Sequence, residues 1–173
     1  GGLLGELTRR YGLSLICVGC HLYLHAARIP LARRLGAGSR GAPIISGERE
    51  SHDNKLKLNQ VAPALDAYAA LCAEFGVELM HPIRRVSQGA RIEEILGLDW
   101  PEGGDQVECV LSGNYRSCGG EVDYDPAALQ AYLEEFALPL ARLVIAEYLA
   151  GRLPNHLELA RGVMRDLPPL PKD

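Results

Sequence analysis

Short apolar runs alternate with stretches of helical periodicity over the first 96 residues, and this alternation constrains the fold more than any other feature of the chain. The apolar runs span residues 13–18, 43–45 and 77–80. The helical stretches span residues 3–11, 20–35, 58–75 and 92–96. Repeated strand–helix units are typical of a parallel sheet covered by its crossover helices. We therefore expect an α/β fold with a Rossmann-like parallel sheet and helices on both faces.

The last third of the chain is predicted to be helical. Asp125 is a good N-cap, and Pro126 suits the first position of a helix. Apolar residues continue at helical spacing over 129–148, and Asn155 is placed to cap a further short helix. We expect these helices to form an appendage that packs on the sheet or serves as a partner or homodimer surface.

Two domains are expected, an α/β domain over residues 1–120 and a helical carboxyl-terminal extension over residues 121–173. The chain enters a helical pattern directly after Gly1 and Gly2, so we expect a further strand and its loop upstream in the complete protein. The net charge of −4 gives no general attraction to nucleic acid or to an anionic membrane surface. No apolar run approaches the ~20 residues needed to span a bilayer. These features predict a cytoplasmic protein without a membrane partner.

Four of the five cysteines form the strongest candidate site. Cys17 and Cys20 are spaced to bind one metal ion or cluster at a strand end, where a helix amino end favours the thiolate. Cys109 would complete three-cysteine ligation of an iron–sulfur cluster. Cys118 could instead close a zinc tetrahedron or carry a persulfide. The alternative is that Cys17 and Cys109 are small buried residues, as expected for Cys72 on its apolar helix stripe.

The polar loop 46–53 follows an apolar run, at the carboxyl end of a predicted strand, where α/β sheets bind ligands. Gly47 lets backbone amides approach a ligand closely, and Glu48 and Asp53 could hold magnesium against a polyphosphate. Arg49 is a further candidate for contact with such a ligand. The alternative is a solvated, charged loop.

Two histidines are weaker candidates. His21 and His25 lie one helical turn apart, which permits ligation of one metal ion. The alternatives are polar residues lining a pocket and a solvated stripe on the helix surface. His81 follows the third apolar run and is predicted only to turn the chain outward.

Over residues 13–115 the chain resembles the middle of the PP-loop ATP pyrophosphatases. The resembling features are Cys-x-x-Cys before a helix, Ala-Arg-x-Leu-Gly-Ala at 32–37, an apolar strand, a loop from Gly47 to Asp53, and Gln60. The chain is most similar to tRNA-thiolating members, which carry a third cysteine some ninety residues later, and Cys109 follows Cys20 by 89 residues. Two features depart from the family. The Ser-Gly-Gly-x-Asp-Ser phosphate loop is absent from the sequence, and the loop from Gly47 differs from Gly-His-His-x-x-Asp-Asp.

The resemblance implies an adenine nucleotide α-hydrolase-like fold and an ATP-dependent sulfur transferase that uses magnesium. Such an enzyme adenylates a nucleotide-like substrate, such as a tRNA base. The attacking sulfur comes from a sulfur donor and is held on a [4Fe–4S] cluster or as a cysteine persulfide. One alternative is a ligase or amidase of the queuosine-precursor type, in which four cysteines hold structural zinc. Another is a non-catalytic metal-binding or redox-sensing protein on the same fold.

Overall fold

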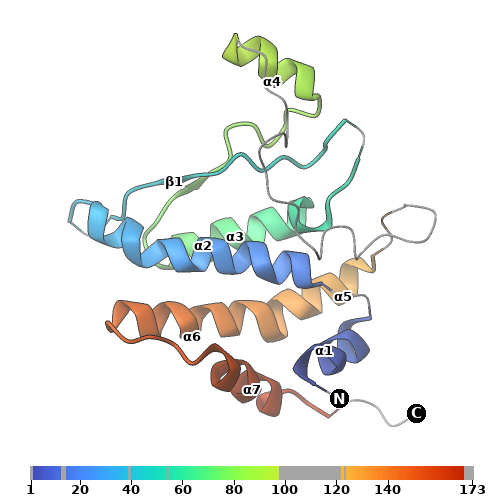
Figure 1. The fold of residues 1–173 in the computed structure, drawn as a ribbon, viewed down its shortest axis with the longest axis vertical. Helices are drawn as coiled ribbons and strands as arrows, with labels where there is room; N and C mark the ends of the chain where they lie inside the picture. Colours follow the sequence, from blue (N-terminus) through green and yellow to red (C-terminus); the bar gives the residue numbers. More distant parts are fainter. Residues whose placement is uncertain are drawn as a thin grey trace.

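The computed structural model describes residues 2–12, 15–38, 40–53, 55–97, 122 and 124–169 (Figure 1). The first half of the chain contains α1 (Leu3–Tyr11), α2 (Ile16–Leu35), β1 (Ile44–Ile45), the 3-10 turn η1 (Leu58–Gln60), α3 (Ala62–Glu74), β2 (Leu79–Met80) and α4 (Gly89–Leu96). The second half contains α5 (Pro126–Ala131), the π-helical segment η2 (Tyr132–Ala137), α6 (Leu138–Leu149) and α7 (His156–Asp166).

The fold is mostly helical, and the predicted Rossmann-like sheet with helices on both faces is wrong. Within the described residues the only sheet is one parallel pair of two-residue strands, with Ile44 beside Leu79 and Ile45 beside Met80. The described part of the run 13–18, predicted as a strand, instead enters α2 at Ile16. A short, fully buried apolar run fits a buried helix as well as a strand, and periodicity alone does not separate the two.

Helix α2 lies at the centre of the molecule and packs against both α3 and α6 (Figure 1). Its Val18, Ala26 and Ile29 side chains are completely buried. Helix α6 supplies Ile145 to the same hydrophobic core, and α3 supplies Leu65. The carboxyl-terminal helices therefore share a core with the first half of the chain.

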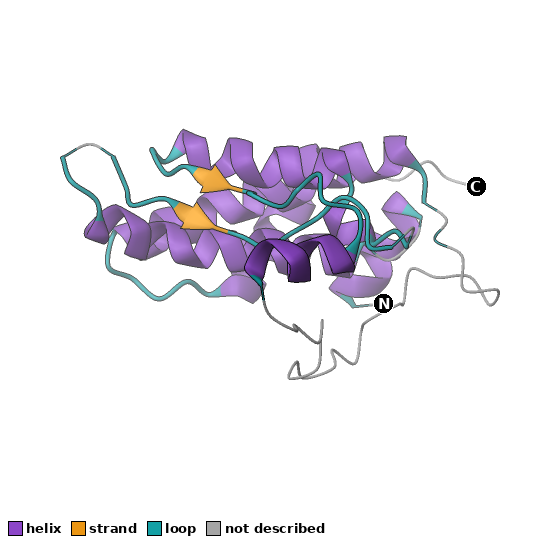
Figure 2. Cartoon of the chain, turned by 90° about the horizontal axis from the view of Figure 1, so that it is seen from above, coloured by secondary structure: helices purple, strands orange, loops and turns teal. Residues whose placement is uncertain are grey.

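The two strands form a parallel β1–α3–β2 unit, and Figure 2 shows them side by side. The amide of Ile44 donates to the carbonyl of Glu78, and the amide of Ser46 donates to the carbonyl of Met80. Gly41 leads into β1 so close to Val77 that an added Cβ would overlap its side chain. The strands predicted at 43–45 and 77–80 are thus confirmed, and both end at the same edge.

The predicted carboxyl-terminal helices are confirmed. The Asp125 side chain accepts a hydrogen bond from the Ala127 amide, and the Asn155 side chain accepts one from Glu158. Segments α5, η2 and α6 follow one another without a break. The π-helical segment ends two residues before Pro139, whose ring would clash with the carbonyl four residues earlier in a regular α-helix.

Among the described residues, no single helix has both the length and the apolar character to cross a membrane; only α1 and α2 taken together as a bent pair reach that threshold.

Candidate metal centre

A buried carboxylate is surrounded by four hydrogen-bond donors. Glu48 is only 6% exposed. Its Oε1 lies 2.8 Å from His21 Nδ1, while its Oε2 lies 3.1 Å from both His25 Nε2 and His81 Nε2. The Ser46 hydroxyl donates to Oε2 over 2.9 Å. Three imidazoles and a hydroxyl therefore converge on one side chain.

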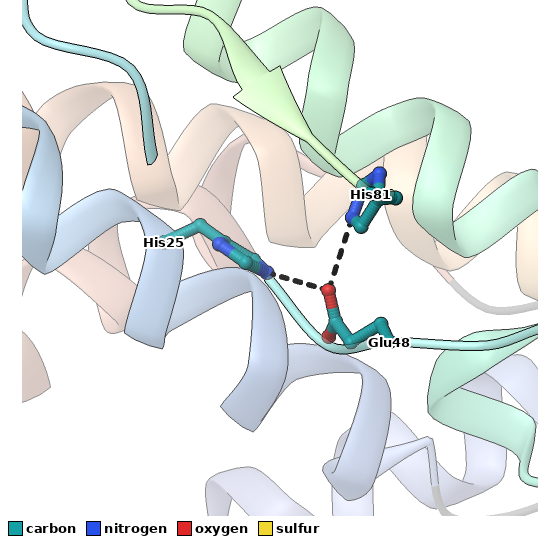
Figure 3. A group of neighbouring side chains, drawn as sticks. All are labelled: His25, Glu48 and His81. Carbon is teal, nitrogen blue, oxygen red and sulfur yellow. Dashed lines mark hydrogen bonds and ion pairs between the residues drawn. The ribbon is translucent and has the colours of Figure 1, made fainter. Parts of the chain in front are cut away.

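Three elements bring these groups together. His21 and His25 lie one turn apart on α2, Glu48 follows β1, and His81 follows β2 directly. Because β1 and β2 are parallel, their carboxyl ends open at the same edge, and α2 passes alongside. Figure 3 shows His25, Glu48 and His81 pointing toward one another from these three elements.

The Glu48 carboxylate is held as an anion. Burial alone would raise the pKa of Glu48, but the hydrogen bonds from His21, His25 and Ser46 outweigh it and lower this pKa far below its ordinary value. A carboxylate that stays ionised in a buried site is a ready ligand for a cation.

Three of the convergent atoms have the spacing of metal ligands. His25 Nε2, Glu48 Oε2 and His81 Nε2 all lie within 4.8 Å of one another. A tetrahedral zinc ion with bonds of about 2.0–2.1 Å separates its ligand atoms by about 3.3 Å, close to the 3.1 Å between Glu48 and each histidine. Three protein ligands of the type His, His, Glu leave one position open, as catalytic zinc sites do.

A second ring of contacts supports the cluster from α3 and η1. The Asn59 side-chain amide lies 2.8 Å from His21 Nε2. The Tyr68 hydroxyl lies 3.0 Å from the Asn59 carbonyl and 3.1 Å from the Val18 carbonyl of α2. His25 Nδ1, in contrast, is buried and has no hydrogen-bond partner within the described residues. Support for the cluster therefore reaches Glu48 through His21.

The cysteine site is only partly described. Cys17 and Cys20 lie in the first turns of α2 and not at a strand end. Cys20 lines an open cavity of about 580 Å³ between α1, α2, η2, α6 and α7. Cys109 and Cys118 lie outside the described residues. Cys72 is completely buried, as predicted for a core residue.

The candidates in the loop 46–53 separate into different roles. Glu48 belongs to the cluster, whereas Gly47 is exposed. The buried Arg49 donates its backbone amide to the Gln60 side chain and its guanidinium to the Val86 carbonyl. Asp53 is exposed and accepts a hydrogen bond from the backbone amide of the first residue of α4. Within these contacts, Arg49 and Asp53 fix the loop and the start of α4.

Sequence reasoning missed His81 as a site residue. The signal was present, because Glu48 and His81 each follow a predicted strand, and parallel strands end at the same edge. The possibility that His25 binds a metal was raised from its spacing to His21, although the structure groups His25 with Glu48 and His81 instead.

Comparison with known proteins finds a relative of this chain. The chain is 40% identical over 156 residues to the uncharacterized protein MJ0009 of Methanocaldococcus jannaschii, and the match covers 90% of this chain and 54% of the relative. The chain thus spans about half the length of the protein it matches. No family model and no solved structure matches the chain. The relative's name states no activity, so the function must be sought in the site.

Proposed function

We propose that this chain binds one divalent transition-metal ion, zinc in the first instance, through His25, Glu48 and His81, and uses it for hydrolysis. The observation that carries the proposal is the convergence of two imidazole nitrogens on the oxygen of a buried, ionised carboxylate. Imidazole and carboxylate ligands together suit zinc and iron better than magnesium or calcium. Magnesium at this edge is correspondingly less well supported.

The open coordination position gives the proposed centre its chemistry. Zinc with three protein ligands lowers the pKa of a bound water to about 7 and so supplies hydroxide at neutral pH. Ser46 keeps its hydroxyl 2.9 Å from the ligand oxygen of Glu48, next to the coordination sphere. His21 is the most exposed of the three clustered histidines, with a third of its side chain accessible, so solvent reaches the cluster on that side.

Metal titration tests the binding step. Protein stripped with a chelator should take up one equivalent of Zn²⁺ or Co²⁺ by calorimetry and elemental analysis. His25→Ala and His81→Ala should each weaken binding at least tenfold, because each removes one of three ligands. His156→Ala is the matched control, since His156 lies at the start of α7 beside Tyr23 and outside the cluster. A stripped wild-type protein that binds neither ion, or a His81→Ala variant that binds as tightly as wild type, contradicts the proposal.

The hydrolytic step needs a separate assay. Zinc-loaded and stripped protein should be compared on chromogenic carboxylic esters, amides and phosphate esters. Activity should require the metal and survive His156→Ala, and it should disappear in His81→Ala. A protein that binds zinc but hydrolyses none of these classes would retain the metal site and contradict hydrolysis on those substrates.

Sulfur transfer of the PP-loop type is a second candidate, favoured by the position of Cys17. Cys17, His21 and His25 follow one another at intervals of four residues along α2, so all three lie along one side of that helix. In this reading Cys17 and Cys20 hold sulfur or part of a cluster, and ATP and a tRNA-like substrate approach the loop at Gly47. Stoichiometric iron and sulfide in brown, anaerobically purified protein would favour it, and colourless protein with zinc would favour hydrolysis. The cytoplasmic location stays a prediction.

A further inference from the structure

We propose that His21 is the positioning residue of the metal centre, and that Asn59 selects the His21 tautomer that does the positioning. This inference rests on the proposed metal site and adds residues outside its three ligands. It concerns Oε1 of Glu48, the carboxylate oxygen that faces His21 and not the metal-ligand histidines His25 and His81.

The two oxygens of Glu48 have separate partners. Oε2 faces His25, His81 and Ser46, whereas within the described residues Oε1 has only His21 as a partner, at 2.8 Å. The last torsion of a glutamate side chain is broad and turns easily. A donor that holds Oε1 therefore fixes the carboxylate plane and presents Oε2 to the site of the ion.

Asn59 determines which nitrogen of His21 carries the hydrogen. The Asn59 amide nitrogen lies 2.8 Å from His21 Nε2 and is a donor, so Nε2 accepts and the hydrogen of a neutral ring sits on Nδ1. That hydrogen points at Glu48 Oε1. With the amide reversed, a neutral ring would carry its hydrogen on Nε2, and a lone pair on Nδ1 would face the carboxylate. The arrangement with Asn59 as donor avoids this repulsion.

His25 lacks an equivalent support within the described residues. Metal-binding histidines usually donate their second N–H to an acceptor, which fixes the ring. His25 Nδ1 has no such partner within the described residues. Asn59 is itself anchored, because its backbone carbonyl lies 3.0 Å from the Tyr68 hydroxyl and the residue is buried. The chain Tyr68–Asn59–His21–Glu48 is therefore the route by which α3 orients the ligand set.

A pair of near-isosteric variants tests this role. In His21→Asn the amide nitrogen takes the place of Nδ1 and keeps the donor to Glu48, whereas in His21→Gln it takes the place of Nε2 and loses it. Zn²⁺ affinity should stay within about threefold of wild type in His21→Asn, and fall about 10–100-fold in His21→Gln and His21→Ala, the usual loss for an outer-shell partner. Asn59→Leu should show a similar loss. The visible spectrum of the Co²⁺ form should match wild type only in His21→Asn.

The outcomes separate this inference from the metal site itself. Wild-type affinity in His21→Gln and His21→Ala overturns the positioning role and leaves the three-ligand site standing. Equal losses in His21→Asn, His21→Gln and His21→Ala also overturn it, because the Nδ1 donor would then not be the feature that matters. Absence of metal binding by the wild-type protein overturns both proposals. Circular dichroism of each stripped variant confirms that the affinities compare folded proteins.

Discussion

His81 Nε2 lies 3.1 Å from Glu48 Oε2, although 33 residues separate the two side chains along the chain. The pairing of β1 with β2 explains this contact. Ile45 lies beside Met80, and both strands run in the same direction. Glu48, three residues beyond one strand, therefore meets His81, one residue beyond the other. Any change that slips this short pairing would separate the two side chains, so the cluster depends on the β1–α3–β2 unit.

Replacement of Glu48 by glutamine should destabilise the metal-free protein. Glu48→Gln keeps the shape of the side chain but removes the charge that four donors address. The usual energies of hydrogen bonds to charged groups and of buried ion pairs predict that this variant loses about 2–4 kcal/mol in the free energy of unfolding. Urea denaturation in the presence of a chelator measures it. Glu74→Gln is the control, because its exposed pair with Arg142 should be worth less than about 1 kcal/mol.

The stability difference between wild type and Glu48→Gln should decrease in acid. The pKa of Glu48 is lower in the folded protein than the value of about 4.3 expected in the unfolded chain. A group of this kind contributes its full stability above the unfolded pKa and loses it as the pH falls toward the folded pKa. The difference between wild type and Glu48→Gln should therefore shrink as the pH falls below about 4.3. A difference that stays unchanged down to about pH 2 would contradict the assignment of Glu48 as an anion.

Local signals predicted most of the helices but not the architecture. Helix ends with a chemical marker were found correctly, such as Asp125 before α5 and Asn155 before α7. The run 13–18 was assigned to a strand because its apolar residues show no clear period. Tertiary packing makes the described part of this run helical, since Leu15 and Val18 are buried in the core around α2. Without that strand, the sheet is reduced to β1 and β2 among the described residues.

The candidate site was predictable only where a local sequence pattern marks it. Glu48 was found because it follows a strand and a glycine, a purely local pattern. Its grouping with His25 and His81 was not predicted, because the direction of His25 and the register of His81 are set by how α2 and β2 pack against the loop. The cysteine spacing suggested a site at a strand end, but the structure places Cys17 and Cys20 on a helix.

Removal of the Tyr68 hydroxyl should weaken both the fold and the metal centre. In Tyr68→Phe the buried carbonyls of Val18 and Asn59 lose a donor, at a cost of about 1–2 kcal/mol. Asn59 would also be less firmly held against His21, so zinc affinity should fall severalfold. Tyr148→Phe is the control, because its hydroxyl contacts Tyr23 at an exposed position. Equal stability and affinity in the two variants would argue against the proposed support from α3.

Zinc should stabilise the folded protein if the three ligands bind it. A ligand present at 100 times its dissociation constant adds about 2.7 kcal/mol, which for a chain of this size raises the melting temperature by roughly 5–10 °C. His81→Ala should lose this rise, whereas His156→Ala should keep it. Differential scanning calorimetry with and without chelator provides the measurement. A rise of equal size in His81→Ala would show that zinc acts elsewhere on the protein.

The effect of Gly19→Ala on the free energy of unfolding should change sign when Tyr132 is replaced by phenylalanine. Gly19 lies inside α2, and a Cβ added there would overlap the Tyr132 hydroxyl, while the ring carbon behind that hydroxyl would lie at 3.5 Å, an ordinary contact distance. Gly19→Ala should therefore cost about 1–3 kcal/mol through overpacking, despite the gain of about 1 kcal/mol that alanine brings to a helix interior. In a Tyr132→Phe background the obstructing oxygen is gone, so the same substitution should stabilise α2 by up to about 1 kcal/mol. Denaturant unfolding of the four proteins in this cycle gives the coupling energy directly. Additive effects would mean that α2 and η2 are not in contact at this point, and the close packing of the central helix against η2 would have to be abandoned.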